Sequence, residues 1–335
     1  MSDDSSQKQS RGPMQMTKPV ETDVFFVVDG ERLEAQAILL AATLKRHLTP
    51  NQTAIAYVRE DHADRLAPLT RAVLDRTGVE IRVIPDTDGG THQPWSSPYP
   101  QGNKILAAAE PRKATVSVFL DTDTVLIQPV DFAAQLGDAL VAASASDYSA
   151  TANDDGSWGA FYGLFGLPLP DERITLRGGR QIESLPYYNA GVVIFRERMG
   201  TKPTGFGKGW LADAVHFDHH ATPGHDRATI DQFTLPITAT RQGRPVAGLD
   251  QAMNYNIQAF GDETDDPLWI AHYHNIGVLW AHGPTARHVV ECLLDVISDD
   301  ELAEYIDRFF IHIKRSRLKH VLRDVQAVRA GQAAE

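Results

Sequence analysis

The strongest candidate for chemistry is a pair of aspartates, Asp121 and Asp123, separated only by Thr122. They directly follow residues 116–120, an apolar run that predicts a strand buried on both faces. Open α/β sheets bind ligands at the carboxyl ends of such strands. Two carboxylates at that edge can share a divalent cation, whose other positions accept phosphate oxygens. The pair therefore predicts a metal site for a phosphorylated ligand.

A second pair of the same form, Asp86 and Asp88, has a different context. It follows Pro85 and precedes two glycines, which indicates a turn that enters a long irregular loop over residues 85–102. The first interpretation of this pair is loop solvation or helix capping, and the second is substrate contact. The Asp121 pair is followed by the apolar residues 125–127, so ordered chain holds it on both sides.

Two later segments could reach the same edge. Asn189, Ala190 and Gly191 open a predicted strand, and their small side chains allow a ligand to approach the backbone closely. Asp231 and Gln232 begin a predicted helix, where backbone N–H groups favour polar ligands.

A histidine completes the predicted set. His272 ends a late apolar run and could supply an imidazole to the cation. His274 lies two residues further on, so strand alternation would put it on the same face, and it competes with His272 as the third ligand.

The elements that must position these residues alternate regularly. Apolar runs and amphipathic stretches between residues 24 and 84 predict strand, helix, strand, helix, strand. This order is typical of an α/β domain with one mostly parallel, Rossmann-like sheet flanked by helices. Residues 1–20 are polar and predict a disordered leader, residues 147–184 predict inserted loops, and two helices are expected at about 285–297 and 301–329.

Composition excludes several classes of protein. The chain has 335 residues and a formal net charge of -12, which disfavours a nucleic-acid-binding protein. Its single cysteine, Cys292, excludes a disulfide framework and a multi-cysteine zinc site. No run is long and apolar enough to span a membrane, and no secretory signal follows Met1, so a soluble cytoplasmic enzyme is expected.

Taken in order, these motifs resemble the family-8-like retaining glycosyltransferases of GT-A fold, the group of glycogenin and the bacterial lipooligosaccharide galactosyltransferases. The resemblance runs from about residue 24 to 280 and includes His272, Tyr273 and Trp280 of the family's late motif. It implies a GT-A domain over residues 21–283 and a helical extension over 284–335.

The resemblance also implies roles for residues. Mn²⁺ (or Mg²⁺) would be bound by Asp121, Asp123 and His272. Further contacts to a nucleotide diphosphate sugar, with uridine the family's usual base, would come from a larger set: Thr122, Lys104, Asn189, Ala190, Gly191 and Val28. Gln232 and Asp231 would lie beside the reacting sugar, which would be transferred with retention to the hydroxyl of a glycan, a lipid-linked acceptor or a small molecule.

The late motif departs from the family at three positions. Asn275, Val278 and Leu279 stand where the family has Gly, Lys and Pro. The family lysine contacts the departing diphosphate, so another basic residue must replace it, and Arg287 is one candidate. The substitution also keeps open a catalytically impaired domain that only binds a nucleotide sugar or glycan.

Three further features allow more than one interpretation. An inverting GT-A enzyme would need a carboxylate base, for which Asp154, Asp155 or Asp231 could serve. The histidines at 216, 219, 220 and 225 predict an exposed loop near the acceptor or, less readily, an auxiliary zinc site. The basic helix expected over 308–329 could pack on the domain or lie on an anionic membrane.

Overall fold

The computed structural model describes residues 19–84, 94–147, 154–177, 182–221, 227–261 and 267–332. Most of the predicted leader, the Asp86–Asp88 pair and His225 lie outside these residues.

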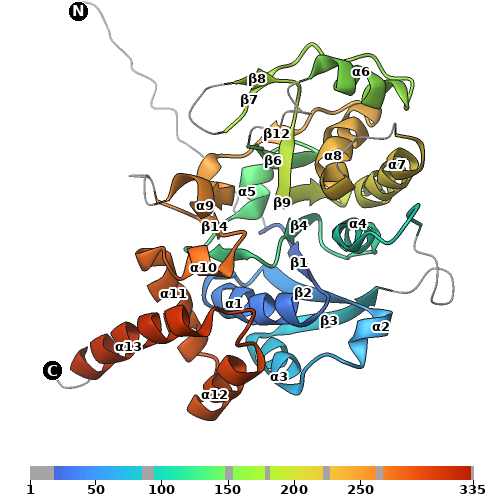
Figure 1. Ribbon diagram of the computed structural model, residues 1–335. Coiled ribbons are helices and arrows are strands. Elements are labelled where there is room, and N and C mark those ends of the chain that lie inside the picture. Colours follow the sequence, from blue (N-terminus) through green and yellow to red (C-terminus); the bar gives the residue numbers. More distant parts are fainter. Residues whose placement is uncertain are drawn as a thin grey trace, which may run out of the picture.

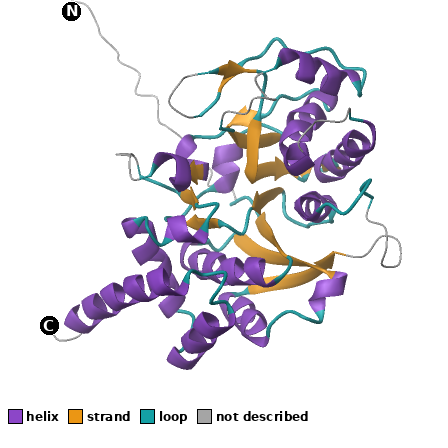
Figure 2. Cartoon of the chain, viewed as in Figure 1, coloured by secondary structure: helices purple, strands orange, loops and turns teal. Residues whose placement is uncertain are grey.

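A twisted sheet forms the centre of the molecule (Figure 2). It has seven strands, in the order β12-β6-β9-β4-β1-β2-β3. All its neighbouring strands pair in parallel except β9, which runs antiparallel to both β4 and β6. The strands are β1 (Thr22–Val28), β2 (Gln52–Arg59), β3 (Val79–Ile84), β4 (Val116–Leu120), β6 (Val141–Ala145), β9 (Tyr188–Arg196) and β12 (Ala247–Gly248). The mostly parallel α/β sheet is confirmed.

A smaller sheet joins the end of the β4 segment to the late part of the chain. Its order is β13-β14-β5, with bounds Tyr255–Asn256, Ile270–His272 and Thr124–Leu126. The antiparallel register puts His272 opposite Thr124, next to Asp123. Two short pairs lie elsewhere: β7 (Ile174–Thr175) with β8 (Glu183–Ser184), and β10 (Arg198–Met199) with β11 (Lys202–Pro203).

Helices cover both faces of the central sheet (Figure 1). One face carries α1 (Glu31–His47) and α3 (Pro68–Thr77), over which α11 (Gly283–Leu294), α12 (Asp299–Arg308) and α13 (Arg315–Gln332) pack. The other carries α4 (Asn103–Ala109), α6 (Asp155–Gly163), α7 (Phe206–His220) and α8 (Ile230–Arg241). The shorter helices are α2 (Glu60–Ala63), α5 (Phe132–Leu136), α9 (Ile257–Phe260) and α10 (Ile276–Leu279).

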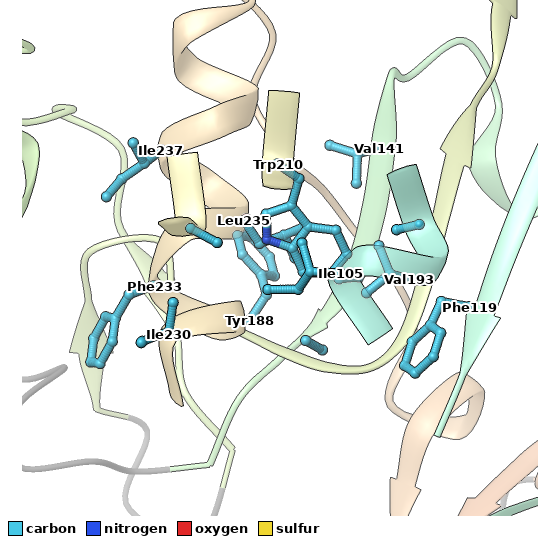
Figure 3. Close-up of a cluster of buried hydrophobic side chains, with 14 of the residues drawn as sticks. Ile105, Phe119, Val141, Tyr188, Val193, Trp210, Ile230, Phe233, Leu235 and Ile237 are labelled. Carbon is cyan, nitrogen blue, oxygen red and sulfur yellow. The ribbon is translucent and has the colours of Figure 1, made fainter. Parts of the chain in front are cut away.

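The strands form because their apolar side chains alternate between two cores. In β1, Phe25 and Val27 face the α4–α7–α8 side, whereas Val24, Phe26 and Val28 face α1. Figure 3 shows the first core, where Trp210 lies among apolar side chains and its indole N–H donates to Thr234 at 3.1 Å. Both faces of β1 are thus buried, as the continuous apolar run predicts.

Three predicted elements differ in the structure. The sequence predicts a helix over residues 231–239 that is broken by Pro236, but α8 passes through Pro236 without breaking, because burial of its flanks outweighs one lost backbone hydrogen bond. The helix expected over 301–329 is two helices, since Lys314 adopts a left-handed backbone (φ 50°) between buried Phe309 and Ile313 and the start of α13. Residues expected as inserted loops contain α6, whose aromatic side chains are buried.

Candidate functional site

A cavity of about 300 Å³ opens at the carboxyl ends of β1 and β4. It is lined by Val27, Asp29, Arg32, Leu33, Gln36, Pro100, Gln101, Asn103, Lys104, Phe119, Asp121, Thr122 and Asp123. The polar wall is partly fixed in advance, because the Asn103 amide donates to Asp29 at 2.8 Å. Val28 lies between two lining residues, but its own side chain is fully buried in the core beneath α1.

Lys104 bridges two carboxylates beside this cavity. Its Nζ lies 2.9 Å from an Asp121 oxygen and 2.9 Å from an Asp231 oxygen. Burial opposes the charge of Lys104, but the attraction of Asp121 and then Asp231 outweighs it and raises the pKa of the ammonium group. Lys104 of α4, Asp121 directly after β4 and Asp231 of α8 therefore form one charged cluster, which brings together predicted residues far apart in the sequence.

Asp123 faces the late strand β14 instead. Its Oδ1 lies 3.1 Å from Nε2 of His272, and the His272 and His274 rings are 3.8 Å apart between centroids. Ligand atoms of Asp123, His272 and His274 all lie within 4.8 Å of one another. We call these three residues the carboxylate–histidine group. The resemblance assigns Asp121 to the same metal site, but in the structure Asp121 is paired with Lys104.

The protonation states of this group suit a cation. Burial would raise the pKa of Asp123, but His272 lowers it below the ordinary carboxylate value. Burial and then repulsion from His272 lower the pKa of His274 to about 4, so His274 is neutral at pH 7. A carboxylate and imidazole nitrogens are donors that Mn²⁺ and similar divalent cations accept.

A chain of amides orients His272. Its Nδ1 lies 2.9 Å from Oδ1 of Asn254, whose own amide donates to Asn189 at 2.9 Å. Such an outer partner fixes the ring and leaves Nε2 facing Asp123. Sequence reasoning missed Asn254, because no motif marks it and it reaches the site only through the fold.

The small residues of the 189–191 segment serve the protein itself. A Cβ on Gly191 would lie 2.5 Å from the His272 ring, and Asp121 donates its N–H to the Gly191 carbonyl at 2.8 Å. Gly191 thus lets the His272 imidazole approach the strand; the predicted approach of a ligand to this segment stays a prediction. Ala190 is buried in the core.

The two residues expected beside the reacting sugar lie on the first turn of α8. Oε1 of Gln232 accepts a hydrogen bond from Ser146 at 2.9 Å. Asp231 is buried, and its Oδ1 has no hydrogen-bond partner among the described residues. This oxygen is therefore a buried acceptor that no described donor satisfies.

A second hollow of about 780 Å³ is strongly basic. It lies where α10 meets the start of α13, and its lining is Asn275, Gly277, Val278, Lys314, Arg315, Ser316, Arg317 and Lys319. Arg317 donates to the Gly277 carbonyl at 2.6 Å. Thus four cations surround the Val278 position, whereas Arg287, the candidate from sequence, is not among the lining residues.

The remaining candidates have structural partners. Asp154 caps α6, and Asp155 pairs with Arg173 at 2.9 Å. His216 and His219 lie in α7 rather than a loop, and Asp218 between them binds Arg227 at 2.6 Å. Within the described residues, no helix is both long and apolar enough to cross a membrane.

Comparisons with known proteins agree with this geometry. A family model, the Rhodobacterales glycosyltransferase domain, matches residues 24–243. No curated protein matches the chain.

Two solved structures share the fold. The apo WbbM bifunctional glycosyltransferase aligns with a TM-score of 0.51 and 13% identity, over 88% of this chain and 53% of WbbM, so this chain spans about half of its length. The galactosyltransferase LgtC, in complex with donor and acceptor sugar analogues, aligns with a TM-score of 0.51 and 13% identity, over 84% of this chain and 99% of LgtC. At this identity the likeness shows a common GT-A fold.

Proposed function

Because the chain belongs to the Rhodobacterales glycosyltransferase family and has the GT-A fold, we propose that it transfers a sugar from a nucleotide diphosphate donor, with UDP the favoured carrier, to an acceptor hydroxyl. The observation that carries this proposal is the carboxylate–histidine group beside a cavity at the carboxyl ends of β1 and β4. Residues 21–283 form the catalytic domain in this proposal, and residues 284–335 form its helical extension.

Asp123 and His272 would hold a divalent cation, with His274 or Asp121 as further ligands. The fit rests on the 3.1 Å approach of Asp123 to His272 and on the amide of Asn254 behind the ring. When bound, Mn²⁺ supplies Lewis acidity to the leaving diphosphate. Asp121 becomes available for this set if Lys104 turns toward a phosphate.

Lys104 and Asp231 act on the donor from the other side. Lys104 presents a permanent positive charge at the cavity wall, and the free oxygen of Asp231 accepts a sugar hydroxyl. Gln232 lies next to it, and by family resemblance this pair flanks the reacting carbon with retention of its configuration. An inverting enzyme is less well supported, because Asp154 caps α6 and Asp155 pairs with Arg173, which leaves Asp231 as its candidate base.

In this proposal the basic hollow supplies the positive charge of the family lysine that Val278 replaces. Lys314 and Arg317 stand beside Gly277 and Val278, and together they would neutralise the diphosphate or another anionic part of a substrate. Replacing Arg317 by alanine removes one charge-assisted hydrogen bond, so the donor KM should rise roughly 10-fold. Arg323→Ala, an exposed cation of the same helix outside the hollow, is the matched control. An equal change of the donor KM in both variants would show that the hollow is not part of the donor site.

The turn between α12 and α13 could also contact an anionic lipid surface that holds the acceptor. Phe310 and Ile311 are 52% and 64% exposed and come shortly before the cations of the hollow in the chain. Vesicles of phosphatidylglycerol should then sediment the protein and vesicles of phosphatidylcholine should not. Retention of binding in the Phe310→Ser, Ile311→Ser double variant would contradict this contact.

Thermal stability with UDP, GDP, CMP and ADP, each with and without manganese, tests the donor site. A ligand that binds the folded chain raises the unfolding midpoint. We expect a manganese-dependent rise with one diphosphate that disappears in Asp121→Ala and Asp123→Ala and persists in Asp75→Asn, an exposed control. A flat response to every nucleotide would overturn the proposal.

Release of the nucleoside diphosphate then separates an enzyme from a pure binder. A catalytically impaired domain would shift its midpoint with the nucleotide yet hydrolyse no donor. The anomeric configuration of the product decides between retention and inversion.

A further inference from the structure

A second group of metal-binding side chains lies away from the cavity, where α1 ends against α11. His47 is the last residue of α1, and His288 and Cys292 lie one turn apart on α11. Ligand atoms of the three side chains all lie within 4.8 Å of one another. We call them the helix-end group. None of them belongs to the site proposed for the sugar donor.

The distances fit the edges of a tetrahedron. Nε2 of His288 lies 3.0 Å from Nε2 of His47, 3.6 Å from Sγ of Cys292 and 3.0 Å from the carbonyl oxygen of Leu126. In tetrahedral zinc sites, bonds of about 2.0 Å to nitrogen and about 2.3 Å to sulfur put nitrogens about 3.3 Å apart and nitrogen about 3.5 Å from sulfur. The three distances from His288 thus agree with three edges of such a tetrahedron, and the ligand atoms of His47 and Cys292 also lie within 4.8 Å of each other.

Hydrogen bonds alone satisfy this arrangement poorly. A neutral imidazole carries one hydrogen. The Nε2 of His288 can donate that hydrogen to the Leu126 carbonyl, or it can accept a hydrogen from His47. It cannot make both hydrogen bonds at once. A cation held by the three side chains would satisfy both imidazole nitrogens and the sulfur together, with the Leu126 carbonyl oxygen as a further ligand.

The protonation states agree with this geometry. Burial and then the neighbouring His288 lower the pKa of His47 to about 4, and burial likewise lowers the pKa of His288, so both rings are neutral at pH 7. Burial raises the pKa of Cys292 to about 12, but a bound metal deprotonates a coordinating thiol. Arg46 lies near the thiol and is paired with Asp295 at 2.5 Å and with Glu291 at 3.6 Å.

We propose that His47, His288 and Cys292 form a structural Zn²⁺ site, with the Leu126 carbonyl at the fourth corner. This donor set of imidazole nitrogen and thiolate sulfur favours zinc over the oxygen-seeking Mn²⁺ and Mg²⁺. The ion would tie three segments together: the end of α1, helix α11 and strand β5. It thereby fastens the 284–335 extension to the domain.

Cobalt substitution gives a direct test, because Cys292 is the only cysteine of the chain. A thiolate-to-cobalt charge-transfer band in the untagged, chelator-stripped protein can arise from this residue alone. We expect the band in the wild-type chain, its displacement by zinc, its loss in Cys292→Ser, and its loss or marked weakening in His47→Gln and His288→Gln. Asp123→Asn, which alters the other group, should keep it.

A second measurement uses only the wild-type chain, so its result does not depend on whether the variants fold. Stoichiometric zinc should slow alkylation of Cys292 by roughly 10-fold or more, because a coordinated thiolate is shielded from the reagent. The absence of a cobalt band in a folded chain, a band that survives both histidine substitutions, or unchanged alkylation with zinc would each overturn the proposal.

Discussion

The carboxylate–histidine group and the helix-end group both contain two histidines, yet their surroundings differ. Asp123 and His272 lie at strand ends beside a cavity, and His274 holds a left-handed backbone with φ 49°. His47, His288 and Cys292 lie on two packed helices with a backbone carbonyl behind them. The comparison shows that the neighbours of an imidazole determine which cation it can help to bind. A carboxylate beside an open cavity favours a cation that can exchange, whereas a thiol buried between helices favours a cation that stays bound.

Electrostatics separates the two groups in the same way. Burial opposes the charge of Asp123, and His272 restores it, so this carboxylate stays charged. In the helix-end group burial leaves both imidazoles and the thiol neutral. The first group is thus a preformed anionic partner for a cation, and the second must release the thiol proton when it binds one.

The largest effect is expected from Asp123→Asn. This change removes the charge that faces His272 and keeps the shape of the side chain, so manganese-dependent transfer should fall by at least about 100-fold while the fold persists. Initial rates at saturating donor measure it, and Asp75→Asn is the control. Near-normal turnover would show that the carboxylate–histidine group is not the reacting centre.

Lys104→Met should follow in size. The variant leaves Asp121 and Asp231 facing each other without their shared cation, and removing one partner of a buried ion pair costs about 3 kcal/mol of unfolding free energy. Urea unfolding at pH 7 measures the loss. The difference from the wild type should shrink as the carboxylates become protonated at low pH, and a constant difference would contradict the electrostatic cause.

Chelation should affect stability and activity through different groups. Removing zinc should lower the unfolding midpoint of the wild type by several degrees but leave that of Cys292→Ser unchanged, since the variant has no site to empty. Manganese added back should restore transfer in both chains without restoring the lost midpoint. Restoration of the unfolding midpoint by manganese alone would contradict the assignment of different metals to the two groups.

The smallest expected effect is on the pH dependence of the metal-free protein. The pKa of His47 lies near 4 in the folded chain and near 6.5 when unfolded, so the unfolded state binds more protons between these values. Stability is therefore complete above about pH 6.5 and decreases as the pH falls toward 4. His47→Gln should flatten this decrease in unfolding free energy measured with chelator present, and an unchanged slope would assign it to other residues.

Local pattern was enough to predict much of the fold. Alternating strands and helices over residues 24–84 predicted the parallel half of the sheet, and the strand before Asp121 located the edge where the cavity lies. Prediction failed at the α12–α13 break, because the side chains of residues 309–314 continue an amphipathic pattern through a turn. Packing of Phe309 and Ile313 and the left-handed backbone of Lys314 determine that turn.

The finer parts of the two groups required tertiary structure. Asn254 carries no motif and becomes relevant only because it lies behind His272. The single cysteine, Cys292, excludes a zinc site with several cysteine ligands, but it leaves open a site that histidines complete. Its histidine neighbours include His47 from a helix that is distant in sequence, so their proximity is a property of packing.

The pairing of Asp123 with His272 has a consequence for biosynthesis. The two residues are 149 positions apart, and β14 must pair with β5 before they meet. Contacts with so large a separation form late, because a long loop must close first. The residues that line the cavity lie between positions 27 and 123, so they are synthesised well before His272. The carboxylate–histidine group is thus completed after the lining of the cavity, when β14 pairs with β5.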